Sequence, residues 1–178
     1  VNSPASVKKD YPAVEAAFTP RLQDVGPLTL RLIVVDDDVV GNFDGVAGST
    51  FDGCERLVNT SEVTGQIALI QRGGCTFEEK IRNAQTAGAK AVVVFSDQGE
   101  PIVMTVARNS VRIPALMIGQ ADGQLLRDRL VAEDPVEVTL DSRFFLTVRD
   151  QGNQMQGFSS RGPSAVEPGD RQHPPRVG

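Results

Sequence analysis

The sequence predicts an α/β fold with a sheet-rich core. Short apolar segments with strand character recur through residues 27–148. Two segments between them have the spacing of amphipathic helices, so that strand, helix and strand follow one another over 66–95 and again over 113–140. The predicted strands outnumber the predicted helices, and this favours a core built mainly from a sheet.

Six segments are expected to form strands. The segment 28–35 alternates between apolar and polar residues and then becomes wholly apolar, whereas 91–95 is an unbroken β-branched run typical of a strand buried on both faces. Pro114 favours an edge position or a strand start for the segment 113–118. The last two segments flank Asp141-Ser142-Arg143 and indicate a hairpin. The expected strands are 28–35, 66–71, 91–95, 113–118, 136–140 and 144–148.

Two helices are expected. The first begins after Thr76, an N-cap residue that can form a capping box with Glu79, and it ends at Gly88. Its predicted buried stripe consists of Phe77, Ile81, Ala84 and Gly88. The second runs over about 120–132, where the density of leucine indicates the side that is buried. That predicted side consists of Leu125, Leu126, Leu130 and Val131.

Both ends of the chain are expected to be irregular and mobile. Proline and glycine residues interrupt any long element in residues 1–26, where only Ala13 to Phe18 could form a short helical turn. Residues 149–178 are polar and rich in glycine and proline.

Charge excludes two classes of partner. The 178 residues carry 18 basic and 23 acidic side chains, a formal net charge of −5. Nucleic-acid-binding domains and proteins that dock on anionic membranes need a basic surface. The longest apolar runs, 32–35 and 91–95, are far shorter than the roughly 20 residues of a membrane-spanning helix. We therefore expect neither nucleic acid nor a membrane as a partner.

The serine residues near the C-terminus do not predict a catalytic site. The run 157–162, Gly-Phe-Ser-Ser-Arg-Gly, is close to a nucleophile elbow, but Arg161 stands where the second glycine is needed. His173 lies between a polar run and two prolines, outside any expected element that could hold it against a serine. We expect no catalytic residue and no cofactor in this chain.

An acidic run follows the first long strand. Asp36 to Asp38, with Asp44, offer carboxylate oxygens of the kind that Ca²⁺ prefers. An EF-hand loop that started at Asp36 would fail at Val40 and Ala47, which supply no side-chain oxygen. A solvated turn that closes the strand is the favoured interpretation, and calcium binding remains open.

The two cysteines flank the expected strand 66–71. This placement favours a structural disulfide between Cys54 and Cys75, and hence an oxidising compartment; two free thiols, with a reactive Cys75 before the helix N-terminus, are the alternative. With His173 the two cysteines form no zinc cluster of the usual spacing, and no metal site is expected. Asn59-Thr60-Ser61 makes Asn59 a candidate glycosylation acceptor.

The residues around the second cysteine resemble the protease-associated (PA) domain. That family has Arg-Gly-x-Cys-x-Phe-x-x-Lys, then Asn-Ala and Gly-Ala, and Cys54 matches its partner cysteine. The matching positions here are Arg72, Gly73, Cys75, Phe77, Lys80, Asn83 and Gly88. The segment 113–118, followed by Gly123, matches the second half of the family. The resemblance covers 27–148 and implies a PA-like β-barrel or sandwich core flanked by two main helices, with structural roles for the motif residues.

A second resemblance lies outside that core. Residues 157–164 resemble the Phe-Ser-Ser-Arg-Gly-Pro segment of subtilisin-like serine proteases, and residues 1–7 resemble the catalytic-domain stretch that leads into their PA insert. The resemblance implies three parts: a catalytic-domain flank over 1–26, the PA domain over 27–148 and a second flank over 149–178. It also implies an extracellular, secreted serine endopeptidase as the parent. Neither Ser159 nor Ser160 matches that family's nucleophile.

This resemblance implies a non-catalytic module that mediates protein–protein interaction or gates substrate access to the catalytic cleft. Its partners would be protein or peptide substrates and the catalytic domain of the parent. The alternative is a PA domain of a receptor or sorting protein that binds a ligand.

The long segment 97–111 is the expected interaction loop, because loops on a rigid scaffold carry recognition. Its candidate residues are Gly99, Glu100, Ile102, Met104 and Arg108. In the alternative interpretation, Ile102, Val103 and Met104 pack back on the sheet.

Overall fold

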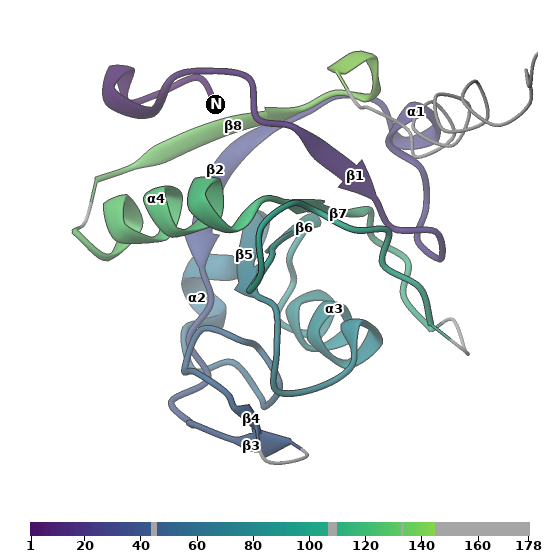
Figure 1. The fold of residues 1–178 in the computed structure, drawn as a ribbon. Helices are drawn as coiled ribbons and strands as arrows, with labels where there is room; N and C mark the ends of the chain where they lie inside the picture. The colour runs from purple at the N-terminus through teal and green to yellow at the C-terminus, as the bar shows by residue number, and fades with distance from the viewer. Residues whose placement is uncertain (44–45, 107–109, 133, 145–178) are drawn as a thin grey trace, which may run out of the picture. The chain divides into compact units, whose positions relative to one another are not determined.

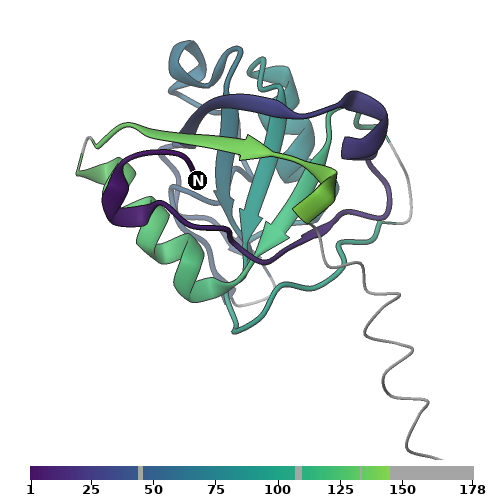
Figure 2. The same ribbon diagram turned by 90° about the horizontal axis from the view of Figure 1, so that it is seen from above.

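A mixed sheet of six strands forms the core of the computed structural model, which describes residues 1–43, 46–106, 110–132 and 134–144. The order across the sheet is β1-β7-β6-β5-β2-β8, and a two-stranded hairpin, β3-β4, lies apart from it. The four inner strands are parallel and the two edge strands are antiparallel to their neighbours. The sheet curls into a half-barrel (Figures 1 and 2). The strands are β1 Ala13–Glu15, β2 Leu28–Val34, β3 Asn42–Phe43, β4 Val46–Ala47, β5 Ile67–Gln71, β6 Ala91–Phe95, β7 Ala115–Ile118 and β8 Val136–Leu140.

Each inner strand sends alternate side chains into two separate hydrophobic clusters. Ala68 and Ile70 of β5 belong to the cluster on one face of the sheet, and Ile67 and Leu69 belong to the cluster on the other. All five residues of β6 are buried. Burial on both faces explains the unbroken apolar run at 91–95, as the sequence predicted.

The two long helices cover opposite faces of the sheet (Figure 1). Helix α3 begins after Thr76, whose side chain and that of Glu79 form the expected capping box. It ends just before Gly88, which has a φ of +88°. Of its predicted stripe, Ile81 and Ala84 are fully buried. The helices are α1 Leu22–Val25, α2 Thr60–Val63, α3 Phe77–Thr86 and α4 Gln120–Val131, with short 3₁₀ turns at Ala5–Val7 and Ser142–Phe144.

The predicted buried side of α4 is correct for Leu126, which is buried, and for Leu130, which packs partly buried against the core, but it is wrong for Leu125 and Val131. Leu125 and Val131 are 38% and 58% exposed, whereas Gly123 and Leu126 face the sheet. A Cβ atom at position 123 would collide with the side chain of Phe95. The glycine therefore lets α4 approach β6, and the close approach sets the rotation of the helix. Leucine density alone did not reveal this rotation.

The N-terminal flank is part of the sheet, contrary to the expected irregular segment. Ala13–Glu15 is strand β1, not a helical turn, because it pairs with the free edge of β7. Pro114 lies just before β7, so its predicted place at a strand start is correct, but β1 makes β7 an inner strand. Further toward the N-terminus, Ser3 forms a β-bridge with Glu137 of β8. The segment thus touches both edges of the half-barrel (Figure 2).

The predicted C-terminal hairpin is only partly covered by the described residues. Strand β8 pairs along its whole length with β2, and Ser142–Phe144 forms a 3₁₀ turn instead of starting a strand. The remainder of the predicted last strand, and the run 157–164, lie outside the described residues. Among the described helices, none has the length and apolar character needed to cross a membrane.

Candidate functional site

The segments that follow the parallel strands meet at the carboxyl edge of the sheet, the usual location of functional groups in α/β folds. The segment 49–55 lies between the ends of β2 and β5. The main-chain nitrogen of Asp37 donates to the carbonyl oxygen of Thr50, and that of Gln71 donates to Phe51. This arrangement brings residues after β2 together with a loop and with the first turn of α3.

Lys80 of α3 reaches into this edge and is fully buried. Its Nζ donates to the carbonyl oxygen of Asp52 at 2.6 Å and to Sγ of Cys54 at 3.3 Å. Oδ1 of Asp52 lies 3.8 Å from the same Nζ. Burial lowers the pKa of Lys80 to about 8, and the carboxylates of Asp52, Asp37 and Glu55 oppose that shift.

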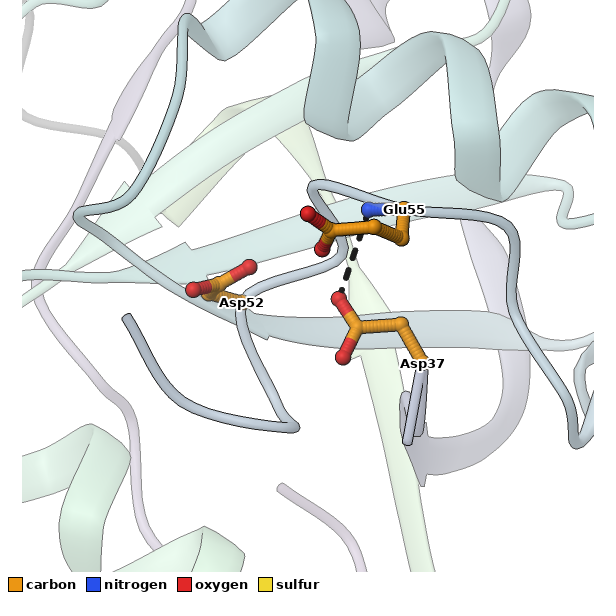
Figure 3. A group of neighbouring side chains, drawn as sticks. All are labelled: Asp37, Asp52 and Glu55. Atoms are coloured by element: carbon orange, nitrogen blue, oxygen red, sulfur yellow. Dashed lines mark hydrogen bonds between the residues drawn. The ribbon is translucent and has the colours of Figure 1, made fainter. Parts of the chain in front are cut away.

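Three carboxylates lie close together at this edge (Figure 3). Asp37, Asp52 and Glu55 each offer a carboxylate oxygen, and these oxygens lie within 4.8 Å of one another. Asp37 and Asp52 are each only 2% exposed. Burial raises the pKa of Asp37 to about 6, while backbone hydrogen bonds from Val39 and Glu55 lower it.

Asp37 and Asp52 accept hydrogen bonds from the loop, and the three carboxylates do not form a recognisable ion-binding shell. Asp52 accepts hydrogen bonds from the main-chain nitrogens of Ser49 and Cys54, at 2.9 and 3.0 Å. A Ca²⁺ ion takes six to eight oxygen ligands, and three carboxylates beside a buried ammonium fall short of that set. We therefore assign Asp37 and Asp52 to holding the loop 49–55, with Lys80 as their counter-charge. The third carboxylate, that of Glu55, has a buried oxygen, Oε2, without a hydrogen-bond partner.

The three aspartates of the acidic run 36–38 lie in different environments. The solvated-turn interpretation is correct for Asp38, which is exposed with a φ of +56°. It is wrong for Asp37, whose side chain turns into the cluster. Asp36 accepts a hydrogen bond from the main-chain nitrogen of Asp38 and so shapes the turn.

Cys54 and Cys75 form a disulfide with a Cα–Cα distance of 5.7 Å. Asn83 of α3 fixes the same loop, because its Nδ2 donates to the carbonyl oxygens of Gly53 and Cys54, each at 2.9 Å. Gly74 has a φ of +78°, and a Cβ there would lie 2.9 Å from Sγ of Cys54. The disulfide indicates a compartment outside the reducing cytosol.

The remaining motif residues lie around this centre. Arg72 pairs with Asp97 at 3.1 Å and so connects the ends of β5 and β6. Gly73 has a φ of +114° and Gly88 a φ of +88°, conformations that favour glycine. Phe77 packs, partly buried, against the core cluster beneath α3.

Asn59 has a structural environment that the glycosylation motif did not indicate. Its Nδ2 donates to the carbonyl oxygen of Val34 at 2.9 Å, and its Oδ1 accepts from the main-chain nitrogen of Asp36 at 3.0 Å. The side chain thereby continues the backbone pairing at the end of β2.

The predicted interaction loop is partly anchored and partly exposed. Met104 is fully buried, so the packing alternative is correct for it, whereas Ile102 is 42% exposed. Gln120 anchors the start of the loop, since its side chain accepts from the main-chain nitrogen of Gly99 and donates to the carbonyl oxygen of Asp97. Glu100 is exposed. Arg108 lies outside the described residues.

A cavity of about 190 Å³ lies between this loop and the N-terminus of α4. It is lined by Pro12, Gly99, Glu100, Gly119, Gln120, Ala121 and Asp122. The exposed loop residues Gly99 and Glu100 thus border a recess that is formed by a rigid helix end.

Sequence reasoning missed the buried charges. Lys80 was recognised as a motif residue, but lysines on amphipathic helices are usually solvated, so its full burial was not expected. Its position three residues after Phe77 and one before Ile81, on the apolar stripe of α3, was the available signal. Asp52 had no signal of its own.

Together the mixed half-barrel, the two covering helices and the disulfide-bound loop define a small α/β module. Residues 31–126, more than half of the chain, match the family model of the PA domain. The chain belongs to the PA domain family, and this domain is in general a non-catalytic module.

The relatives with curated descriptions are larger proteins. "Receptor homology region, transmembrane domain- and RING domain-containing protein 6" of Arabidopsis thaliana is 38% identical over 109 residues, 52% of this chain and 34% of that protein. Aminopeptidase YwaD of Bacillus subtilis is 42% identical over 69 residues, 38% of this chain and 15% of that protein. The chain thus spans about a third of the first relative and less of the second.

A solved structure shares the fold. The zinc aminopeptidase BSAP from Bacillus subtilis superposes with a TM-score of 0.50 at 29% identity, covering 67% of this chain and 26% of that one. The likeness agrees with the predicted PA-like α/β core.

Proposed function

We propose that this chain is the non-catalytic PA domain of a secreted subtilisin-like serine protease, in which it governs the access of protein substrates to the catalytic cleft. The residues 157–164 and 1–7 support this parent, because they resemble the stretches that flank the PA insert in that family, in the same order. A peptidase parent also agrees with the similarity to an aminopeptidase.

The contact is assigned to the loop 97–106. The observation that carries the assignment is the exposure of Ile102 between two anchored points. Gln120 holds one end of the loop and buried Met104 holds the other, so an apolar side chain is presented on a segment with restricted freedom. Preorganised apolar side chains bind protein partners at a lower entropic cost.

The test uses variants of the full-length parent protease. Ile102→Asp is expected to lower kcat/KM for a protein substrate such as casein by about five- to tenfold, as for an interface residue worth roughly 1 kcal/mol, and to leave a short peptide substrate unaffected. Val131→Asp is the matched control, because Val131 is an exposed valine of α4. An equal loss for both substrates, or the same loss in the control, would contradict gating by this loop.

A receptor-type or sorting-type PA domain is the second candidate. The 38% identity to the receptor homology region protein favours it. The coding DNA on both sides of this segment distinguishes the two proposals. A downstream Gly-Thr-Ser nucleophile motif with upstream catalytic Asp and His motifs supports the protease, whereas a downstream membrane span supports the receptor.

A further inference from the structure

The two sulfur atoms of the disulfide have different surroundings. The ammonium group of Lys80 lies 3.3 Å from Sγ of Cys54, and its side chain is fully buried. Gly74 covers the same sulfur so closely that a Cβ at this position would lie 2.9 Å from it. Both cysteines are half-buried, so the two sulfur atoms differ in their charged neighbours and not in burial. Cys75 directly precedes Thr76, the exposed N-cap residue of α3.

This difference determines which of the two sulfur atoms is attacked in thiol–disulfide exchange and which one leaves. In such an exchange a thiolate attacks one sulfur and the other leaves as a thiolate, and the sulfur with the lower thiol pKa leaves faster. A neighbouring cation stabilises a thiolate. Lys80 places a full positive charge in contact with Cys54, whereas Cys75 meets only the partial positive charge at the N-terminus of α3. The carboxylate of Asp52, which accepts from the main-chain nitrogen of Cys54, opposes Lys80. The contact with the ammonium group outweighs both effects, so Cys54 is the better leaving group and Cys75 is the sulfur that is attacked.

We propose that Cys75 is a modification site for a low-molecular-weight thiol, which forms a mixed disulfide there and releases Cys54 as a thiolate paired with Lys80. The incoming thiol loses its proton to solvent, and its sulfur bonds to Sγ of Cys75. The Cys54–Cys75 bond breaks, and its electron pair remains on Sγ of Cys54. One disulfide replaces another, so no external oxidant or reductant is needed.

The surrounding contacts allow this exchange in the folded protein. Asn83 binds the carbonyl oxygens of Gly53 and Cys54, and Lys80 binds that of Asp52. These hydrogen bonds do not depend on the disulfide and hold the backbone at Cys54 when the bond opens. The released thiolate therefore stays beside Lys80, where it can attack the mixed disulfide and reverse the reaction. This inference does not depend on the identity of the parent protein.

The first test uses the wild-type 178-residue chain and glutathione as the thiol. The folded protein is incubated with millimolar glutathione, free thiols are trapped with N-ethylmaleimide, and the peptides are identified by mass spectrometry. We expect glutathione on Cys75 and maleimide on Cys54. Glutathione mainly on Cys54, equal labelling of the two cysteines or no adduct at all would overturn the proposal.

The second test isolates the role of Lys80. Lys80→Met is expected to slow adduct formation by about three- to tenfold, because the leaving thiolate loses its cation. Lys90→Met is the matched control, since Lys90 is exposed, and its rate should equal that of the wild type. An unchanged rate in folded Lys80→Met would overturn the role of the lysine.

A third measurement tests the role of Lys80 if the Lys80→Met variant does not fold. In Cys75→Ser, the rate of alkylation of Cys54 by iodoacetamide is followed against pH. The thiolate beside Lys80 should titrate below the ordinary thiol pKa of about 8.5. A midpoint at or above that value would contradict the proposal.

Discussion

The Nζ of Lys80 donates a 2.6 Å hydrogen bond to the main-chain carbonyl oxygen of Asp52, and neither side chain has appreciable contact with water. The pair joins α3 to the loop that carries Cys54. The same ammonium group compensates the charge of the neighbouring carboxylates, so one side chain provides both a backbone contact and a counter-charge. This relationship makes the stability of the edge sensitive to single substitutions.

Lys80→Met is expected to destabilise the domain by about 3 kcal/mol, because the removal of one partner leaves buried carboxylates without their counter-charge. Urea unfolding followed by circular dichroism measures this loss. Lys90→Met, at an exposed lysine, should change the free energy of unfolding by less than about 0.5 kcal/mol. Equal stability of the two variants would show that the buried pair contributes nothing.

The ionisation of Asp37 is expected to lower the free energy of unfolding as the pH rises. Burial raises its pKa in the folded state to about 6, above the ordinary value of 3.8, so the folded state binds the proton more tightly. The contribution of this group to stability is therefore full below pH about 4 and is lost as the pH rises to about 6.

Asp37→Asn removes this titration while keeping a side-chain carbonyl oxygen as an acceptor. The variant should gain stability relative to the wild type between pH 4 and pH 7, by about 2 kcal/mol or more. Urea unfolding of both proteins at the two pH values gives the difference. Asp38→Asn, at an exposed neighbour, is the control. A difference that is independent of pH would contradict the buried, protonatable state of Asp37.

Gly123→Ala is expected to cost about 1–3 kcal/mol, because the added methyl group collides with Phe95 and separates α4 from β6. Gln124→Ala, on the exposed side of the same helix, should be neutral or slightly stabilising. Thermal unfolding of both variants provides the comparison. If Gly123→Ala is as stable as Gln124→Ala, the close approach of α4 is not required.

Asn59→Ala is expected to cost about 1–3 kcal/mol, since it leaves a backbone carbonyl and a backbone amide at the end of β2 without their partners. Ser61→Ala also removes the glycosylation motif but leaves both hydrogen bonds in place. Unfolding of the two variants made in a bacterial host separates the roles. Equal stability would contradict the structural role of the amide.

The predictable parts of the fold were those with local signals. The β-branched run at 91–95 indicated a strand buried on both faces, and Thr76 with Glu79 fixed the start of α3. The placement of the two cysteines on either side of β5 favoured the disulfide that is present. Each of these depends on neighbours in the sequence.

The features that were missed depend on distant partners. Strand β1 forms because β7 offers it a free edge, and nothing within Ala13–Glu15 indicates that pairing. The rotation of α4 depends on contact between Gly123 and Phe95. The burial of Asp37 depends on the loop that brings Asp52 and Glu55 beside it. Long-range packing overrides local preference in each case.

The N-terminal segment has a consequence for aggregation. Exposed edges of a sheet present unpaired backbone groups that recruit strands from other molecules. Residues 13–15 occupy the edge of β7, and Ser3 occupies part of the edge of β8, so one short segment protects both ends of the same sheet. A protein that began at residue 27, where the PA resemblance begins, would expose both edges and should self-associate, although every residue of the family motif would still be present.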